Sequence, residues 1–244
     1  MDCSAQRPAV VFVPGFMQPG DAWAPVAEGL PERYPSILLD HAENSFEGRL
    51  AEIANAGEGA VLCGYSLGGR LALHAAIREP GRYAGLVTVG ASAGIEAPAT
   101  RAARAEADER LASWMETQPI EQIVEVWERQ PLFADQAEQL LEAQRPGRLD
   151  QDSRGLAMLL RTAGQGTLDP LWQGLHELDI PVLALAGELD ERYCEVARRI
   201  ARMVPRGTVQ VVENAGHAAQ LQRPEAVAGL LADFLDQHLG QRLV

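Results

Sequence analysis

The stretch Gly64-Tyr65-Ser66-Leu67-Gly68-Gly69 decides the fold of this chain. It follows a short apolar run at residues 60–63 and opens a helix-like stretch at residues 67–78. In that strand–turn–helix context, the G-x-S-x-G spacing holds the serine in strained backbone geometry, and only glycines tolerate the crowding beside it. We therefore expect Ser66 at a helix N-terminus above a sheet, where backbone N–H groups and the helix dipole favour negative charge. The alternative is a plain glycine turn with a solvent-exposed serine.

The rest of the chain alternates between apolar runs and helix-like stretches. The apolar runs lie at residues 9–13, 36–40, 60–64, 85–90, 181–187 and 208–212, and the helix-like stretches at 21–30, 46–56, 67–78, 192–203 and 224–238. Nearly continuous apolar runs are typical of parallel strands that are covered on both faces. The alternation predicts an α/β fold with a mostly parallel, doubly wound sheet.

One interval breaks this alternation. Between Ala91 and Gly174 there is no convincing strand, only a helical pattern broken at Pro98, Pro119, Pro131, Pro146 and Pro170. We predict an α/β core from residues 1–92 and 175–244, with residues 93–174 inserted as a helical lid. Such a lid would cover the carboxyl edge of the sheet, where α/β folds bind their ligands. The alternative is an extra helical layer with no role at the site.

A reactive serine requires an imidazole that takes its proton and a carboxylate that fixes the imidazole's tautomer. On this fold the expected chain order is serine, then Asp or Glu, then histidine. Asp190 lies three residues past the apolar run that ends at Gly187, and His217 lies just past the last run. We predict Ser66, Asp190 and His217 as the catalytic residues. Glu188 is a rival acid that lies too close to its strand, and four other histidines lack the order or the loop context: His41, His74, His176 and His238.

An oxyanion hole needs a second strand-end loop. The first predicted strand is followed by Pro14-Gly15-Phe16-Met17, at the same sheet edge as Ser66. We expect the backbone N–H groups of Phe16 and Leu67 to be the two donors.

Composition limits the partners. The chain has 244 residues with 34 acidic and 21 basic side chains, a net charge of −13, and every basic residue is arginine. Such a chain is a poor ligand for nucleic acid or for anionic membranes, although a local basic pocket is compatible with it.

Cys3, Cys63 and Cys194 form no CxxC pair, so we expect no disulfide scaffold and no metal site. No apolar run is long enough to span a bilayer, and the first strand begins too early for a signal peptide, so we expect a cytoplasmic protein.

The motifs resemble those of the α/β-hydrolase superfamily and, within it, of the 2-succinyl-6-hydroxy-2,4-cyclohexadiene-1-carboxylate synthases of menaquinone biosynthesis. The resemblance covers almost the whole chain. Two features distinguish this family most clearly. One is an arginine, Arg70, directly after the glycines of the serine turn, and the other is the segment Trp127-Glu128-Arg129-Gln130-Pro131-Leu132-Phe133. Three further segments complete the resemblance, of which the last two occur in many hydrolases: 155–157 through 170–172, 186–190 and 214–217.

This resemblance implies a lyase that eliminates pyruvate from a substrate with several carboxylates, with Ser66 acting as a base and with no cofactor. It places Arg104 and Arg148 as ligands of substrate carboxylates, although Arg145 and Arg154 compete for the second position. Arg70 lies one helical turn past Ser66, and a polyanionic substrate is well matched by guanidinium groups. Tyr65 and Trp127 would supply aromatic walls. For any of these arginines, the alternative is an exposed partner of a nearby glutamate.

The sequence also departs from the family pattern. Pro14-Gly15 stands where members usually have His-Gly, and residues 39–45 replace an L-P-G-H-G-x-S loop, so we expect added charge beside the pocket. Two rival functions follow: a carboxylesterase or carbon–carbon bond hydrolase that uses Ser66 as a nucleophile, and a non-catalytic binding protein. The expected partner is a small anionic molecule, and the sequence leaves a monomer and a homodimer both open.

Overall fold

A single parallel sheet organises the protein. The computed structural model describes residues 7–239, and Cys3 lies outside them. The strands are β1 (Val10–Val13), β2 (Ser36–Leu38), β3 (Val61–Tyr65), β4 (Gly85–Val89), β5 (Val182–Gly187) and β6 (Gly207–Val212). Their order is β2-β1-β3-β4-β5-β6, and every neighbouring pair is parallel. The predicted α/β class and all six predicted strands are therefore confirmed.

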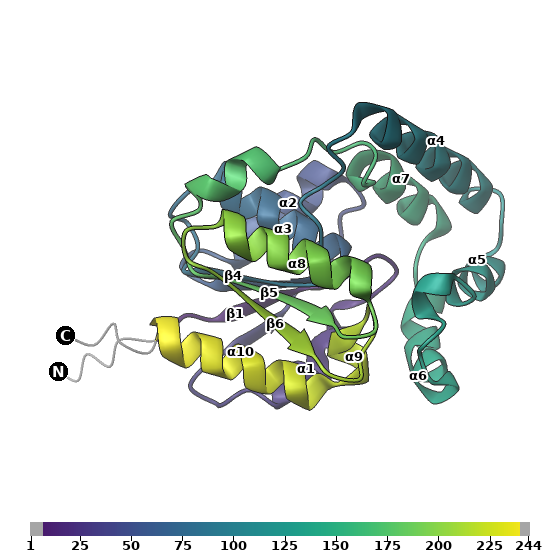
Figure 1. Cartoon of the computed structure of the whole chain (residues 1–244). Helices are drawn as coiled ribbons and strands as arrows, with labels where there is room; N and C mark the ends of the chain where they lie inside the picture. The colour runs from purple at the N-terminus through teal and green to yellow at the C-terminus, as the bar shows by residue number, and fades with distance from the viewer. Residues whose placement is uncertain (1–6, 240–244) are drawn as a thin grey trace.

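Helices cover both faces of this sheet (Figure 1). One face carries α2 (Phe46–Ala56), α3 (Leu67–Arg78) and α8 (Glu191–Met203); the other carries α1 (Ala24–Glu28) and α10 (Pro224–Leu239). Each face has its own apolar cluster, because successive side chains of a strand point to opposite faces. The four central strands are fully buried, as expected for parallel strands between two helical layers.

The prediction of buried strands was wrong for the two edge strands. β2 is largely exposed and β6 is only partly buried, because an edge strand has one neighbour and incomplete cover. The predicted helix at 21–30 is also wrong in detail. It is split into a 3-10 turn, η1 (Gly20–Trp23), and the short α1, in whose first turn Pro25 lies. Proline at that position starts a new helix because its missing N–H needs no partner there.

The interval after β4 is helical. It contains α4 (Pro98–Met115), α5 (Ile120–Glu128), η2 (Pro131–Phe133), α6 (Glu138–Leu149) and α7 (Ser153–Ala163). Figure 1 shows these helices together at the end of the molecule opposite the two termini. Pro98 and Pro131 begin elements and Pro119 caps α5, but the predicted break at Pro146 was wrong. Pro146 is exposed in α6, where water can solvate the carbonyl group that loses its helical partner.

Two hydrogen bonds join the ends of this helical segment at its base. The Leu171 amide donates to Ala93 O over 2.7 Å, and Trp172 Nε1 donates to Gly94 O over 2.9 Å. The following turn, η3 (Trp172–Glu177), packs Trp172 and Leu175 into the apolar cluster of the core. The segment thus leaves and re-enters the core at one point. A lid role for it remains a prediction.

Candidate active site

Ser66 lies in the sharp turn between β3 and α3. Its backbone is left-handed, with φ at 50°, and its amide donates to Val89 O of β4 over 2.9 Å. A Cβ atom on Gly68 would overlap the carbonyl oxygen of Val13, and one on Gly64 would overlap the Gly68 backbone. The glycines of the motif are therefore required by close backbone approach, and together with β4 they fix the strained turn that presents Ser66 Oγ.

His217 connects Ser66 to Asp190. Its Nε2 lies 3.2 Å from Ser66 Oγ, and its Nδ1 lies 2.8 Å from Asp190 Oδ2. Asp190 is itself held, because its Oδ1 accepts from the Tyr193 amide over 3.2 Å as the N-cap of α8. His217 is 3% exposed, and its ring meets the Tyr193 ring edge-on at 4.5 Å and the Tyr65 ring at 5.4 Å. With its proton on Nδ1, this imidazole presents a basic Nε2 to the serine hydroxyl.

The rival acid and the other histidines have different partners. Glu188 accepts from the Asn214 amide over 2.9 Å, so it braces the loop that carries His217. His41 lies 2.6 Å from Glu52, and His74 packs edge-on against Phe46. Burial lowers the pKa of His41 and of His74 to about 4 in each case. Neither lies beside Ser66, so the structure brings together the three residues that the sequence selected.

The loop after β1 approaches the same point. The Gly15 amide donates to the buried Gln18 Oε1 over 3.2 Å, and Met17 has a positive φ of 58°. Phe16 and Leu67 both line the cavity that contains Ser66. Within residues 7–239, the Phe16 amide donates to no protein group, and Leu67, as the first residue of α3, lacks an intrahelical acceptor. An oxyanion hole made by these two amides remains a prediction.

A cavity of about 230 Å³ lies between the α/β core and the helical segment. Nine of the ten predicted site residues line it: Phe16, Tyr65, Ser66, Leu67, Arg70, Arg104, Trp127, Arg148 and His217. The tenth, Asp190, does not line the cavity and contacts His217 Nδ1. Sequence reasoning missed several polar lining residues, namely Gln18, Ser92, Asp108, Gln130, Gln136, Gln165, Arg192 and Tyr193. Most of them come from different loops and helices, so no single motif in the sequence groups them.

Arg70 is the cation nearest to Ser66 along the chain. It lies on α3, one turn after Ser66, and its Nη1 atom is buried without a hydrogen-bond partner among the described residues. Burial lowers the pKa of this guanidinium to about 10. A buried charge without a counter-ion is costly, so an anionic ligand that pairs with Arg70 would offset that cost.

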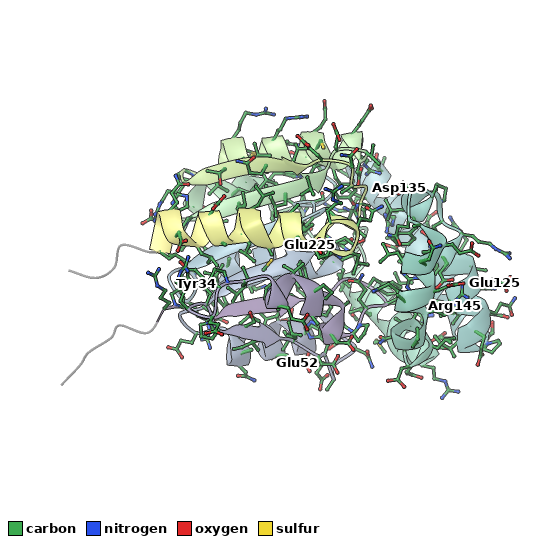
Figure 2. The ribbon with its side chains drawn as sticks, turned by 90° about the horizontal axis from the view of Figure 1, so that it is seen from below. Tyr34, Glu52, Glu125, Asp135, Arg145 and Glu225 are labelled. Carbon is green, nitrogen blue, oxygen red and sulfur yellow. The ribbon has the colours of Figure 1, made fainter. Side chains whose placement is uncertain are left out.

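The two arginines from the helical segment are held by carboxylates. Arg104 Nε donates to Asp108 Oδ1 over 2.7 Å, and Arg148 Nη1 donates to Glu128 Oε1 over 2.9 Å. Arg148 is 2% exposed, and the half-exposed Arg145 binds the other side of Glu128. Figure 2 shows the position of Arg145 on the helical segment. Among the competitors for the second arginine position, Arg148 lines the cavity, whereas Arg154 is exposed.

Aromatic side chains form part of the wall. The Trp127 ring lies 5.1 Å from the Phe16 ring and 5.6 Å from the Phe133 ring, so it joins the core loop to the helical segment. Tyr65 is 4% exposed, and burial raises the pKa of its phenol. Figure 2 also shows Asp135 at this junction, where Gln222 Nε2 donates to it over 3.1 Å.

The loop at residues 39–45 contributes no charged group to the wall of the cavity. None of its residues lines the cavity. Glu52 accepts from the amides of Ala42 and Glu43 over 2.9 and 3.0 Å, which holds the loop against α2. Asn44 packs on Gly155 of α7, so this loop supports the helical segment from outside.

Comparison with known proteins places this geometry in a family. The model of the Alpha/beta hydrolase family matches residues 10–230. The chain belongs to the alpha/beta hydrolase family. It is 31% identical to the 2-succinyl-6-hydroxy-2,4-cyclohexadiene-1-carboxylate synthase of Enterobacter sp. (strain 638), over 93% of this chain and 92% of that protein. The resemblance found in the sequence is therefore confirmed.

Solved structures agree with this assignment. The structure of MenH from S. aureus matches with a TM-score of 0.88 at 26% identity, over 95% of this chain and 94% of that one. A thermophilic esterase from Thermogutta terrifontis matches with a TM-score of 0.81 at 21% identity, over 95% and 90% of the two chains, and so shares the fold. This alpha/beta hydrolase scaffold thus occurs in proteins named for different reactions.

Two other expectations concern metals and membranes. Within residues 7–239, no three His, Cys, Asp or Glu side chains are grouped so that they would hold a metal ion. In the same part of the chain, no helix combines the length and apolar character needed to cross a membrane.

Proposed function

We propose that this alpha/beta hydrolase is a lyase that eliminates pyruvate from a polycarboxylated cyclohexene intermediate of menaquinone biosynthesis. The product would be 2-succinyl-6-hydroxy-2,4-cyclohexadiene-1-carboxylate, the compound named in its relatives' activity. The observation that carries the proposal is one cavity lined by the Ser66–His217 pair and by the three predicted arginines, Arg70, Arg104 and Arg148, which come from two parts of the chain.

The geometry supports proton removal by Ser66. With Asp190 on Nδ1, His217 accepts the hydroxyl proton through Nε2, and Ser66 Oγ then takes a proton from a substrate carbon. The electron pair of the broken C–H bond forms a ring double bond, and the bond to the leaving oxygen breaks. The leaving group departs as the enolate of pyruvate, which is protonated to pyruvate. No acyl-enzyme is required.

Negative charge develops on the substrate during this step. The amides of Phe16 and Leu67 would hold that charge, since both residues line the cavity that contains Ser66. Arg70, Arg104 and Arg148 would bind the substrate carboxylates in fixed, planar geometry. Because these arginines act on ground state and transition state alike, their main effect is expected on substrate binding.

The decisive experiment measures pyruvate. The purified protein is incubated with the succinyl- and pyruvyl-bearing cyclohexene precursor, and pyruvate is followed by a coupled lactate dehydrogenase assay; a nitrophenyl ester is tested in parallel. Pyruvate release without ester cleavage is expected. Ester cleavage without pyruvate would favour the carboxylesterase or carbon–carbon bond hydrolase, and the absence of both would favour a binding protein.

A further inference from the structure

Asp108 is an acidic side chain in a cavity whose other charged lining residues are arginines. It lies on α4, is 4% exposed and lines the same cavity as Ser66 and Arg70. Its Oδ1 accepts from Arg104 Nε over 2.7 Å. Its Oδ2 is buried and has no hydrogen-bond partner among residues 7–239.

Oδ2 lies beside a glycine that also lines the cavity. Gly164, the C-cap of α7, also lines the cavity, and a Cβ atom there would lie 2.7 Å from Oδ2. A side chain at residue 164 would therefore crowd the one oxygen of Asp108 that lacks a partner. A buried acceptor that stays unpaired destabilises the protein, so a ligand that donates to it gains that energy on binding.

Asp108 and Arg104 together have a definite chemical preference. A carboxylate oxygen only accepts hydrogen bonds, whereas the guanidinium only donates them. Arg104 uses Nε on Asp108 and Nη1 on Gln165 Oε1 at 3.3 Å, and Nη2 has no partner in the described chain. The pair therefore matches a ligand in which a hydroxyl group lies beside a carboxylate. The product named for the relatives has this arrangement, because its 6-hydroxyl and 1-carboxylate are on adjacent ring carbons.

We infer that Asp108 is a specificity-determining residue that accepts a hydrogen bond from the ring hydroxyl of the substrate and product, while Arg104 binds the adjacent carboxylate. This inference rests on the proposed function and names a further contact of that site. It explains why an anion is present in a pocket for anions: Asp108 selects hydroxylated ring acids against acids that lack the hydroxyl. Sites that bind a hydroxyl through a buried polar group reject analogues without it, because the group is then left unpaired.

The test compares two ligands that differ at this hydroxyl. One is the hydroxylated product, and the other is 2-succinylbenzoate, which is the product less one water and keeps the succinyl chain and the carboxylate. Their dissociation constants are measured by calorimetry for the wild type, Asp108→Asn and Asp108→Ala. Asp108→Asn keeps an oxygen for Arg104 and removes the charged acceptor. Glu106→Gln is the matched control, since it removes an exposed carboxylate from the same helix.

The wild type is expected to bind the hydroxylated product about tenfold more tightly or better, as a charge-assisted hydrogen bond implies. In Asp108→Asn the ratio of the two dissociation constants should fall to about threefold or less, while 2-succinylbenzoate binds as well or better because a negative charge is lost. Glu106→Gln should keep the wild-type ratio. In Asp108→Ala both ligands should weaken, because Arg104 loses its anchor.

Other outcomes separate the two proposals. If the wild type releases pyruvate but Asp108→Asn leaves the ratio unchanged, or weakens both ligands equally, Asp108 only positions Arg104 and the inference is overturned. If the wild type neither releases pyruvate nor binds either ligand, the proposed function fails and this inference fails with it.

Discussion

The α/β core and the helical segment hold their functional side chains in two different ways. In the core, Ser66 and His217 lie where the chain leaves strands β3 and β6, and the backbone fixes them. Arg70 is held there without any carboxylate partner in the described chain. In the helical segment, each cavity arginine is held by a buried carboxylate, Asp108 or Glu128.

The difference follows from the size of the apolar cluster that each region buries. The sheet buries two large apolar clusters, so its strand ends are rigid without extra partners. The helical segment has one small cluster, and Met17 from the loop after β1 is part of it. A region with so little core needs ion pairs to keep long side chains in one geometry. Among the cavity arginines, Arg70 in the core has no carboxylate partner in the described chain, whereas Arg104 and Arg148 in the helical segment each have one.

The largest expected effect comes from the core triad. Ser66→Ala and His217→Ala should each reduce turnover by about 10⁴-fold or more, because neither partner can move the proton alone. Pyruvate release measures this, and circular dichroism checks that the fold is retained. Retained turnover in either variant would contradict the triad.

Breaking the ion pair in the helical segment should affect stability next. Glu128→Ala leaves Arg148 buried without its carboxylate, and the free energy of unfolding should fall by about 3 kcal/mol. Urea unfolding measures this change. The control is Glu125→Ala, which breaks an exposed pair with Arg129 and should cost roughly 0.5 kcal/mol or less. Equal losses in both variants would remove the contrast between the two regions.

Replacing Arg70 should raise stability, whereas breaking the Glu128–Arg148 pair lowers it. Arg70→Met removes an uncompensated charge, so the protein should become more stable by about 1 kcal/mol. The same change should weaken binding of the hydroxylated product by roughly 10- to 100-fold, through the loss of a charge-assisted contact. Thermal unfolding and calorimetry measure the two effects. A stability loss with unchanged affinity would make Arg70 a structural residue.

The smallest expected effect is on the pH dependence of stability, and it comes from His74 in the core. Burial, reinforced by the nearby Arg78, lowers the pKa of His74 to about 4 from its usual 6.5, so the unfolded chain binds more protons between these values. Stability is therefore fully present above pH 6.5 and is lost as the pH falls toward 4. His74→Leu should reduce the loss between pH 7 and pH 5 by roughly 1–2 kcal/mol. His176→Gln, at an exposed histidine, should leave the dependence unchanged. A steeper loss in His74→Leu would contradict this assignment.

Much of the core could be predicted because its constraints are local. The sequence shows the glycines of the serine turn, the apolar runs and the order of Ser66, Asp190 and His217. The errors occurred where tertiary context changed a local preference: the exposed β2, the split first helix and Pro146 inside α6. Asp108 was missed because an acidic residue on a polar helix looks like a surface residue until its burial is known.

The sequence by itself determined the α/β class, the strained serine turn and which histidine and acid belong with it. Backbone geometry imposes these features on a few neighbouring residues, and glycine positions record that requirement. Only the tertiary structure decided which arginines face the cavity and which carboxylates hold them. Glu128 and Arg148 meet because α5 packs against α6, and the i,i+4 spacing of Arg104 and Asp108 is equally typical of an exposed helix pair, so burial of the pair is decided by packing. The net charge of −13 likewise hides a cavity whose charged lining residues are four arginines and one aspartate, because charge location is set by folding.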